Sequence, residues 1–302
     1  HYAYLKIAEG CNNGCYYCAI PLIRGALRSR EINDCVAEAR WLAGEGVREL
    51  ILVAQDPTAY GEDWGRPGAI CELLDRLQEI DGIRWIRILY AYPERISDAF
   101  IAAMVRNTKV VPYLDLPIQH CDDAVLKAMN RRGGRKEIED AIARLRAAIP
   151  GITLRTTLIA GFPGETEEQY SELCDFVKTV RFDRLGCFAY SAEENTVAAK
   201  MPNQIDEETK QRRADHIMEL QALISAEKEE EKVGRVLECI CDGVDEESGS
   251  YLLRSQADCP EIDGNVIVES ETPLEPGAFY RVKITDADTY DLYGTVEEKV
   301  ED

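Results

Sequence analysis

Apolar and polar residues follow two different patterns along this chain. Up to about residue 233, short runs of consecutive apolar residues, such as Leu50–Ala54, alternate with longer segments in which apolar residues recur every three or four positions. The short runs are typical of strands buried on both faces of a parallel sheet, and the longer segments are typical of amphipathic helices. The predicted strands are Tyr2–Ala8, Leu50–Ala54, Trp85–Leu89, Tyr113–Leu116, Thr153–Ile159 and Leu185–Tyr190.

Helices are expected between these strands. Ser97 and Asp206 are suited to cap helix N-termini, and Thr166 forms a capping box with Gln169. Alternating strands and helices form parallel βα units with right-handed crossovers, and six units are fewer than the eight of a closed barrel. The sequence therefore predicts an α/β fold, a partial, open (β/α)6 barrel. The predicted helices cover Asn33–Gly46, Ile70–Ile80, a segment from Ser97, Asp122–Met129, Lys136–Ile149, Thr166–Val180 and Asp206 to about Lys232.

The pattern changes after Gly234, where glycines separate short apolar segments. Five short strands in about 65 residues indicate a small all-β barrel of the oligonucleotide-binding type. We therefore place a domain boundary near Val233, with domains at residues 1–233 and 234–302. The five strands are predicted at Val236–Cys241, Tyr251–Arg254, Asn265–Glu269, Phe279–Thr285 and Tyr290–Val296.

The charge of the chain is negative and unevenly distributed. The 302 residues contain 35 basic and 56 acidic side chains, a net charge of −21, and residues 235–302 alone contribute −13. An acidic C-terminal domain disfavours phosphate-rich ligands and suits a basic protein partner, although acidity also serves solubility alone. There is no apolar run long enough to span a membrane and no signal peptide. Because the chain starts at His1 and not at methionine, we expect it to be a truncated piece of a longer protein.

The eleven cysteines are an odd number, which argues for a reducing compartment and against a disulfide framework. Most of the dispersed cysteines have apolar neighbours and are expected to pack as small core residues. The dispersed set is Cys35, Cys71, Cys121, Cys174, Cys187, Cys239, Cys241 and Cys259.

The other three cysteines, Cys11, Cys15 and Cys18, form a C-x₃-C-x₂-C motif directly after the first predicted strand. Loops at this end of the strands build the active sites of βα folds. A structural zinc site and an iron–sulfur cubane each normally take four protein ligands, and no histidine lies nearby. A cubane held by three cysteines leaves one iron open to substrate, so we favour a three-cysteine iron–sulfur cluster over zinc.

This motif, with Tyr17 at its aromatic position, resembles the signature of the radical S-adenosylmethionine (SAM) enzymes. Further segments resemble the methylthiotransferase subgroup, closest to the branch that modifies an aspartate of ribosomal protein S12. The resemblance extends from Tyr2 to Gly294, and the C-terminal part resembles a TRAM domain. The segments are AEGCNNGCYYCAIPLIRGALRSR, LILVAQDPTAYG, LPIQH, MNRRG, LRTTLIAGFPGETEEQY, FDRLGCFAYSAEENT and VKITDADTYDLYG.

The resemblance implies that Cys11, Cys15 and Cys18 bind a [4Fe–4S] cluster whose open iron chelates SAM. One electron then cleaves SAM to a 5′-deoxyadenosyl radical. It further places Tyr17 against the adenine, and Gln55 and Asp56 at the methionine moiety. Alternatively, Tyr17 is an aromatic residue of the loop with no role in binding, and Gln55 and Asp56 form a turn at the end of the strand.

Three further residues are expected to bind the cofactor. Gln119 ends the fourth predicted strand, next to His120, which is more often structural than a ligand. Gly161 matches the region beside the adenine, although a glycine before a helix is also common in turns that have no binding role. Arg155 is suited to bind the SAM carboxylate or to pair with a carboxylate of the fold, and the sequence does not separate these.

Two groups of arginines follow the cysteine motif and the fourth strand. They are usually part of a solvated face, and they could also contact an acidic substrate group such as an aspartate side chain. The residues are Arg24, Arg28, Arg30, Arg131, Arg132 and Arg135.

The resemblance implies a cytoplasmic enzyme that adds a methylthio group to the β-carbon of an aspartate in ribosomal protein S12. That basic protein would be the partner of the acidic TRAM domain, with a flavodoxin or ferredoxin as electron donor. The family's N-terminal domain, with a second cluster, is missing from this chain, so we expect SAM cleavage without complete methylthiolation. Two alternatives remain, a transfer RNA adenosine methylthiotransferase and a non-catalytic, metal-stabilised nucleic-acid-binding module. A barrel that binds tRNA is expected to be basic, which makes tRNA the weaker candidate.

Overall fold

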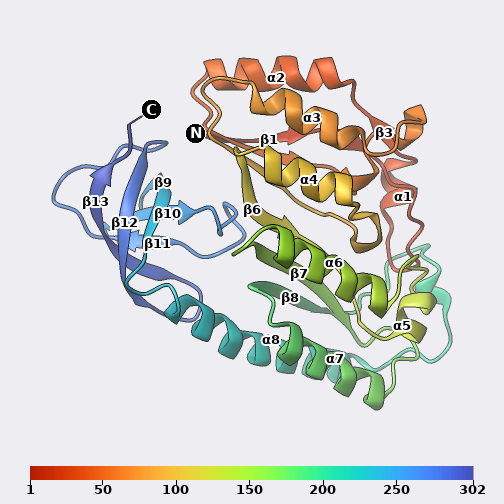
Figure 1. The fold of residues 1–302 in the computed structure, drawn as a ribbon. Helices are drawn as coiled ribbons and strands as arrows, with labels where there is room; N and C mark the ends of the chain where they lie inside the picture. Colours follow the sequence, from red (N-terminus) through yellow and green to blue (C-terminus); the bar gives the residue numbers. More distant parts are fainter. Residues whose placement is uncertain (302) are drawn as a thin grey trace.

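The computed structural model describes residues 1–301. Its larger part is a six-stranded, fully parallel sheet in the order β1-β4-β5-β6-β7-β8 (Figure 1). Neighbouring strands follow one another along the chain, so right-handed crossovers place the helices on one face, and the sheet curls into an open part of a barrel. The predicted (β/α)6 fold is thus confirmed. The strands are β1 Tyr2–Lys6, β4 Glu49–Val53, β5 Trp85–Ile88, β6 Val110–Asp115, β7 Thr153–Ala160 and β8 Arg184–Ala189.

The helices begin largely where the sequence predicts. The Ser97 hydroxyl accepts a hydrogen bond from the Phe100 amide, Thr166 and Gln169 form the capping box, and Asp206 caps the longest helix. The helices of the crossovers are α2 Ile32–Gly44, α3 Ala69–Gln78, α4 Asp98–Arg106, α5 Asp123–Ala128, α6 Arg135–Ala148 and α7 Glu167–Val180, and α8 Glu207–Glu230 connects the last strand to the barrel.

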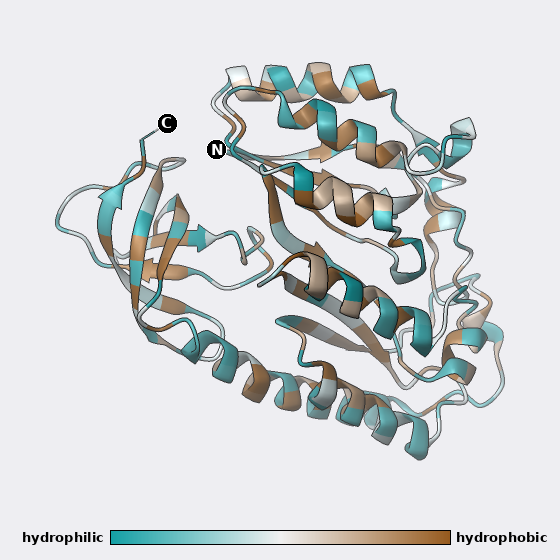
Figure 2. Ribbon diagram, in the orientation of Figure 1, coloured by the Kyte–Doolittle hydropathy of each residue, from teal (hydrophilic) through white to brown (hydrophobic). Residues whose placement is uncertain are grey.

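The main hydrophobic core lies between the sheet and this layer of helices. Alternate strand residues, such as Leu50 and Leu52 of β4, are fully buried there against the apolar faces of the helices. Figure 2 shows hydrophilic and hydrophobic residues interspersed along these helices, as expected for helices with one apolar face. The opposite, concave face of the sheet carries the remaining side chains, including the charged Arg155 and Asp115. No helix within the described residues has the length and apolar character needed to cross a membrane.

The C-terminal part is a closed five-stranded barrel in the order β10-β11-β13-β12-β9, as the sequence predicts. Apolar side chains such as Leu253, Val266 and Val282 fill its interior. The strands are β9 Val236–Val244, β10 Tyr251–Ser255, β11 Val266–Val268, β12 Phe279–Ala287 and β13 Leu292–Lys299.

The barrel packs against the sheet through a second apolar cluster and a set of ion pairs. Phe279 of β12 lies edge-on to Trp85 of β5, with 4.9 Å between the ring centroids. The loop after β10 carries Asp258, which binds Arg184 at 2.7 Å, and Asp263, which accepts a hydrogen bond from the Tyr113 hydroxyl at 2.7 Å. Acidic side chains of the barrel therefore neutralise the buried guanidinium of Arg184 and accept a hydrogen bond from the Tyr113 hydroxyl, both in the sheet.

The structure corrects two details of the prediction. Between the predicted strand Tyr2–Ala8 and the predicted helix Asn33–Gly46, where no element is predicted, lie a five-residue helix, α1 Ile20–Arg24, and a two-residue strand pairing, β2 Ala8–Glu9 with β3 Arg28–Ser29. The fourth strand of the sheet, β6, begins at Val110 and ends at Asp115. Gln119 is therefore not at the strand end. It lies four residues further on and forms only an isolated bridge with Leu158.

Candidate active site

The cysteine loop lies between β2 and α1. Gly10 and Gly14 adopt φ angles of +80° and +67°, which side chains rarely tolerate. The Cys11 amide donates to the Gly25 carbonyl at 3.1 Å, and the Cys18 amide donates to the Cys15 carbonyl at 3.1 Å. Cys15 is buried, and Cys11 and Cys18 are half-buried. The loop is thus a compact turn with three free thiols.

The three thiols suit a cluster better than a single ion. Within residues 1–301, no three histidine, cysteine, aspartate or glutamate side chains lie close enough together to hold one metal ion. The thiols still interact electrostatically with one another, and burial raises the pKa of Cys11 and of Cys18. Each cysteine of a cubane binds a different iron atom, so its ligands surround a body larger than one ion. The donor set therefore fits an iron–sulfur cluster.

Two residues lie beside Cys15: Tyr92, which the sequence did not point to, and Arg131, one of the arginines considered above as a substrate contact. The Tyr92 hydroxyl, just beyond β5, is 3.3 Å from the Cys15 sulfur. The guanidinium of Arg131 lies over the Tyr92 ring, 4.1 Å from its centroid. Arg131 is buried, which corrects its placement on a solvated face. The position of Tyr92 after a strand was the signal that could have found it.

Tyr17 lies in the same environment. It packs against the apolar cluster that contains Met129 and Phe162, and it interacts electrostatically with Cys15 and Arg131. Burial raises the pKa of Tyr17, so its hydroxyl stays protonated. The structure thus places Tyr17 beside the cysteine loop, where it remains our candidate for contact with the adenine.

Asp56 connects the end of β4 to the cysteine loop. Its carboxylate accepts hydrogen bonds from the Thr58 hydroxyl and from the Asn13 side chain, the latter at 2.8 Å, and pairs with Arg95 at 3.1 Å. Burial raises the pKa of Asp56, while these partners lower it. The Asp56 carboxylate thus directs its lone pairs at groups of the protein, which supports a role in holding the cysteine loop in place.

Gln55 has a free acceptor. Its side-chain oxygen Oε1 is buried and has no hydrogen-bond partner within the described part of the chain. A buried polar atom without a partner is costly, and a ligand donor such as an ammonium group would satisfy it. Gln55 therefore fits the predicted contact with the SAM methionine moiety.

Gln119 and His120 lie in the turn that follows β6. Gln119 has a φ of +69°, and its backbone exchanges hydrogen bonds with β7. His120 is fully buried, accepts a hydrogen bond from the Asp122 amide at 3.0 Å, and places its Nε2 3.5 Å from a Glu165 oxygen. A left-handed backbone at a non-glycine residue is a strain found at functional sites, which is consistent with a ligand role for Gln119.

Gly161 follows β7, and the side chain of Lys210 lies close to it. Its amide donates to the Glu165 carboxylate at 3.0–3.1 Å, and its φ is +75°. A Cβ at this position would lie 2.2 Å from Cγ of Lys210. The absence of a side chain at Gly161 is thus explained by Lys210 of α8, whose ammonium donates to the Tyr190 carbonyl.

Arg155 pairs with carboxylates of the fold. Its guanidinium lies 3.0 Å from Asp115 of β6 and 3.8 Å from Asp263 of the barrel. It lies six residues before Gly161 along the strand, about 20 Å in an extended chain. The structure thus places Arg155 toward the barrel, away from the other predicted contacts.

We expect Arg155→Met to destabilise the protein by about 2 kcal/mol at neutral pH, because the almost fully buried Asp115 loses its counter-charge. Burial raises the pKa of Asp115. A carboxyl with a raised folded-state pKa stabilises the fold at low pH and loses this contribution as the pH rises. The destabilisation should therefore be smaller at pH 4 than at pH 8, as urea unfolding would measure. An unchanged stability together with a raised KM for SAM would instead assign Arg155 to the cofactor.

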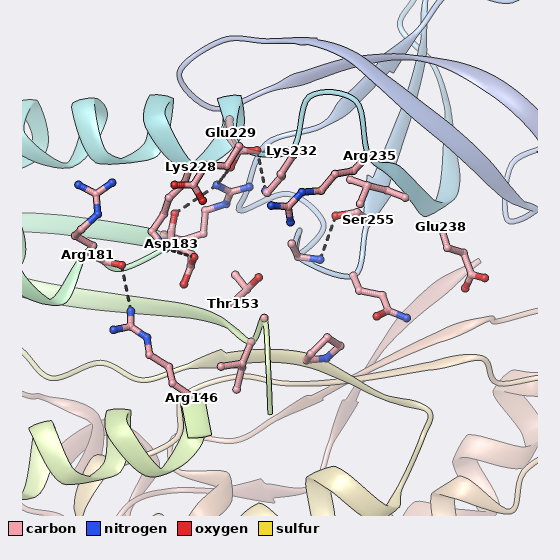
Figure 3. Close-up of a pocket in the computed structure, with 18 of the residues that line it drawn as sticks. Arg146, Thr153, Arg181, Asp183, Lys228, Glu229, Lys232, Arg235, Glu238 and Ser255 are labelled. Atoms are coloured by element: carbon pink, nitrogen blue, oxygen red, sulfur yellow. Dashed lines mark hydrogen bonds and ion pairs between the residues drawn. The ribbon is translucent and has the colours of Figure 1, made fainter. Parts of the chain in front are cut away.

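A cavity of about 790 Å³ lies at the opposite ends of the strands (Figure 3). It is bounded by the N-terminal residues of β7 and β8, the end of α8 and the barrel. Lys228 pairs there with Asp183 at 2.6 Å, and Lys232 pairs with Glu229 at 2.8 Å. Because its charges are largely paired and it lies away from the cysteine loop, this cavity belongs to the junction with the barrel.

Two family models match the chain. The radical SAM superfamily matches residues 5–177, and the TRAM domain matches residues 233–296. A protein named ribosomal protein uS12 methylthiotransferase RimO, from Pelotomaculum thermopropionicum, is 50% identical over 97% of this chain and 66% of its own length. The protein of the same name from Acetivibrio thermocellus is 48% identical over 98% of this chain and 65% of its own length. The chain thus spans about two thirds of the length of these curated relatives.

Solved structures share the fold at low sequence identity. Coproporphyrinogen III oxidase (HemN) from Escherichia coli, a radical SAM enzyme, superimposes with a TM-score of 0.55 and 14% identity over 93% of this chain and 66% of its own. The methyltransferase TsrM from Kitasatospora setae, solved with cobalamin and a [4Fe-4S] cluster, gives a TM-score of 0.53 and 16% identity over 62% of this chain and 36% of its own. The radical SAM model covers more than half of the chain, and a protein named RimO from Caldicellulosiruptor saccharolyticus is 48% identical over 98% of this chain and 67% of its own length. The chain therefore belongs to the radical SAM superfamily and, within it, to the family of the RimO proteins.

Proposed function

We propose that this chain is the catalytic part of a radical SAM methylthiotransferase that modifies an aspartate of ribosomal protein uS12. The observation that carries the proposal is the loop with Cys11, Cys15 and Cys18, which a partial (β/α)6 barrel presents at the ends of its strands. The identity of about 48% to proteins named uS12 methylthiotransferases supports the substrate.

In this proposal the three cysteines would hold a [4Fe–4S] cluster, and Gln55, Tyr17 and Gln119 would line the SAM site, whereas Lys210 occupies the space beside Gly161. The cluster would supply the electron for reductive cleavage of SAM. Gln55 would accept a hydrogen bond from the methionine part, because its Oε1 is buried without a partner among the described residues. The apolar cluster around Tyr17 excludes water from one side of the loop. Asp56 holds the loop in place through Asn13.

A basic ribosomal protein suits the charge of the barrel better than tRNA does. Residues 235–302 carry five basic and 18 acidic side chains. One of the five, Arg254, is buried and pairs with Glu49 and Asp242. Few cations therefore remain on the barrel for a phosphate backbone, which makes tRNA the weaker candidate. We propose that the acidic barrel, as a separate domain at residues 234–302 after the 1–233 core, docks uS12.

We further propose that the protein acts in the cytoplasm, where its ribosomal substrate is made and thiols stay reduced. A small electron carrier such as a flavodoxin or ferredoxin would deliver the electron. All eleven cysteines are free thiols in the structure, which is consistent with a reducing compartment.

The proposal is tested anaerobically, by reconstituting the chain with iron and sulfide, adding SAM and dithionite, and quantifying 5′-deoxyadenosine. We expect product from the wild type and none above background from Cys15→Ala, with Cys35→Ala as a matched control that loses a buried thiol outside the loop. Zinc in place of iron, with no product, would leave a metal-stabilised binding module. Retention of purified uS12, and not of tRNA, tests the substrate assignment.

A further inference from the structure

A buried arginine lies beside the cysteine loop without a strong carboxylate partner. Arg131 follows α5, and its side chain is only 2% exposed. Its Nη2 donates to the Pro117 carbonyl at 3.2 Å, and the nearest carboxylate oxygen, of Glu94, is 3.6 Å away. Its Nη1 is buried and has no hydrogen-bond partner among the residues that the structure describes.

Such a charge is unusual, because a buried guanidinium is normally matched by a close, hydrogen-bonded anion. The guanidinium stays charged at any pH at which the protein is folded. The acidic groups that interact with Arg131 electrostatically are Tyr17, Tyr92, Glu94 and Cys15. Glu94 is a carboxylate, but at 3.6 Å it lies beyond hydrogen-bond distance. Cys15 becomes a second formal anion when its thiolate binds a metal. On the sulfur side, Arg131 therefore faces a negative charge that a bound metal creates.

Tyr92 links the two groups. Its ring lies under the Arg131 guanidinium at 4.1 Å, and its hydroxyl lies 3.3 Å from the Cys15 sulfur. The Tyr92 hydroxyl is therefore placed to donate a hydrogen bond to the Cys15 sulfur. A cation on one face of a phenol makes its hydroxyl a stronger donor, because the charge withdraws electron density from the ring.

We propose that Arg131 and Tyr92 act as a unit that raises the reduction potential of the cluster bound by Cys15. One-electron reduction adds one negative charge to the cluster. A fixed cation and a hydroxyl donor at the ligating sulfur stabilise the reduced form more than the oxidised form. Arg131 and Tyr92 are thus positioning and tuning residues that act through Cys15. This inference rests on the cluster of the proposed function.

The test is an anaerobic potentiometric titration of the reconstituted chain, followed by electron paramagnetic resonance of the reduced cluster. Arg131→Met keeps most of the side-chain volume and removes the charge. We expect about a tenfold less favourable one-electron reduction, equal to a midpoint potential about 59 mV lower. Tyr92→Phe keeps the ring and removes only the hydroxyl, and should give a smaller shift in the same direction. Arg131→Lys, which keeps a positive charge, should remain closer to the wild type.

Arg106→Met is the control, because Arg106 is an exposed arginine at the end of α4 that pairs with Asp75 at 2.7 Å in the outer layer of helices. It should titrate like the wild type. A wild-type potential in an Arg131→Met protein with full iron and sulfide content overturns the inference. If Arg131→Met takes up no cluster, Tyr92→Phe decides, and a wild-type potential there overturns it equally. A wild-type chain that binds no cluster would contradict the proposed function itself.

Discussion

Gly10→Ala should lose most of its iron–sulfur loading, and with it 5′-deoxyadenosine formation. A Cβ at Gly10 would lie 2.2 Å from the Ala26 carbonyl oxygen and 2.7 Å from that of Gly25, and both are backbone atoms that a rotamer change does not move. The φ of +80° adds a cost of about 1–2 kcal/mol for an L-residue. To relieve the clash, the loop must shift away from Gly25, which breaks the Cys11 hydrogen bond.

Gly14→Ala provides the matched control within the same loop. Gly14 also has a positive φ, of +67°, but a Cβ there would meet only the Asn130 side chain, at an ordinary 3.6 Å. We expect a modest loss of stability and near-normal loading. Iron and sulfide content per chain measures both variants. Full loading of Gly10→Ala would show that the loop tolerates displacement and that the close backbone contact does not position Cys11.

Glu49→Gln should lower the free energy of unfolding by about 3–5 kcal/mol. Glu49 is fully buried at the start of β4 and pairs with Arg87 and with Arg254 of the barrel, each at 2.8 Å. Removing its charge leaves Arg87 buried, with the Gln256 carbonyl as its other hydrogen-bond acceptor in the structure. Breaking a buried pair in this way costs more than the pair itself contributes, because an uncompensated charge remains.

Glu238→Gln is the corresponding control, since Glu238 also joins the barrel to the sheet, through Arg84 at 2.7 Å. Both side chains of that pair are partly exposed, 31% and 26%. Its loss should cost less than about 1 kcal/mol. Urea unfolding of the two variants compares these values. Equal, small effects would mean that water reaches the Glu49 network and that the junction with the barrel is not a dry core.

The ion pairs between the barrel and the sheet account for part of the negative charge of the barrel. Asp258 pairs with Arg184 and Asp263 lies 3.8 Å from Arg155, both arginines of the sheet, whereas Asp242 pairs with Arg254 inside the barrel. Part of the acidity thus serves the contact between the two parts of the chain, and only the remainder is available to a basic partner. Counting charges along the sequence does not separate these uses, because the count contains no information on which face each side chain occupies.

Features that depend on interactions between neighbouring residues are predictable from the amino-acid sequence. The helix starts at Ser97, Thr166 and Asp206 follow from a side chain bonding to an amide three positions on, and each is confirmed. Strand positions follow from local apolar runs, and the barrel from the change in their spacing. The cysteine motif belongs to the same class, because three thiols within eight residues share one loop in any fold.

The partners of the long polar side chains, in contrast, depend on how the helices and strands pack. Arg131 could have been solvated, and the packing of α5 and Tyr92 makes it a buried cation next to Cys15. Arg155 had two possible partners, and the pairing of β6 with β7, together with the barrel loop, directs it to Asp115 and Asp263. Such side chains reach partners far away in sequence, and burial, which sets the energy of a charge, depends on the packing of elements that local sequence does not specify.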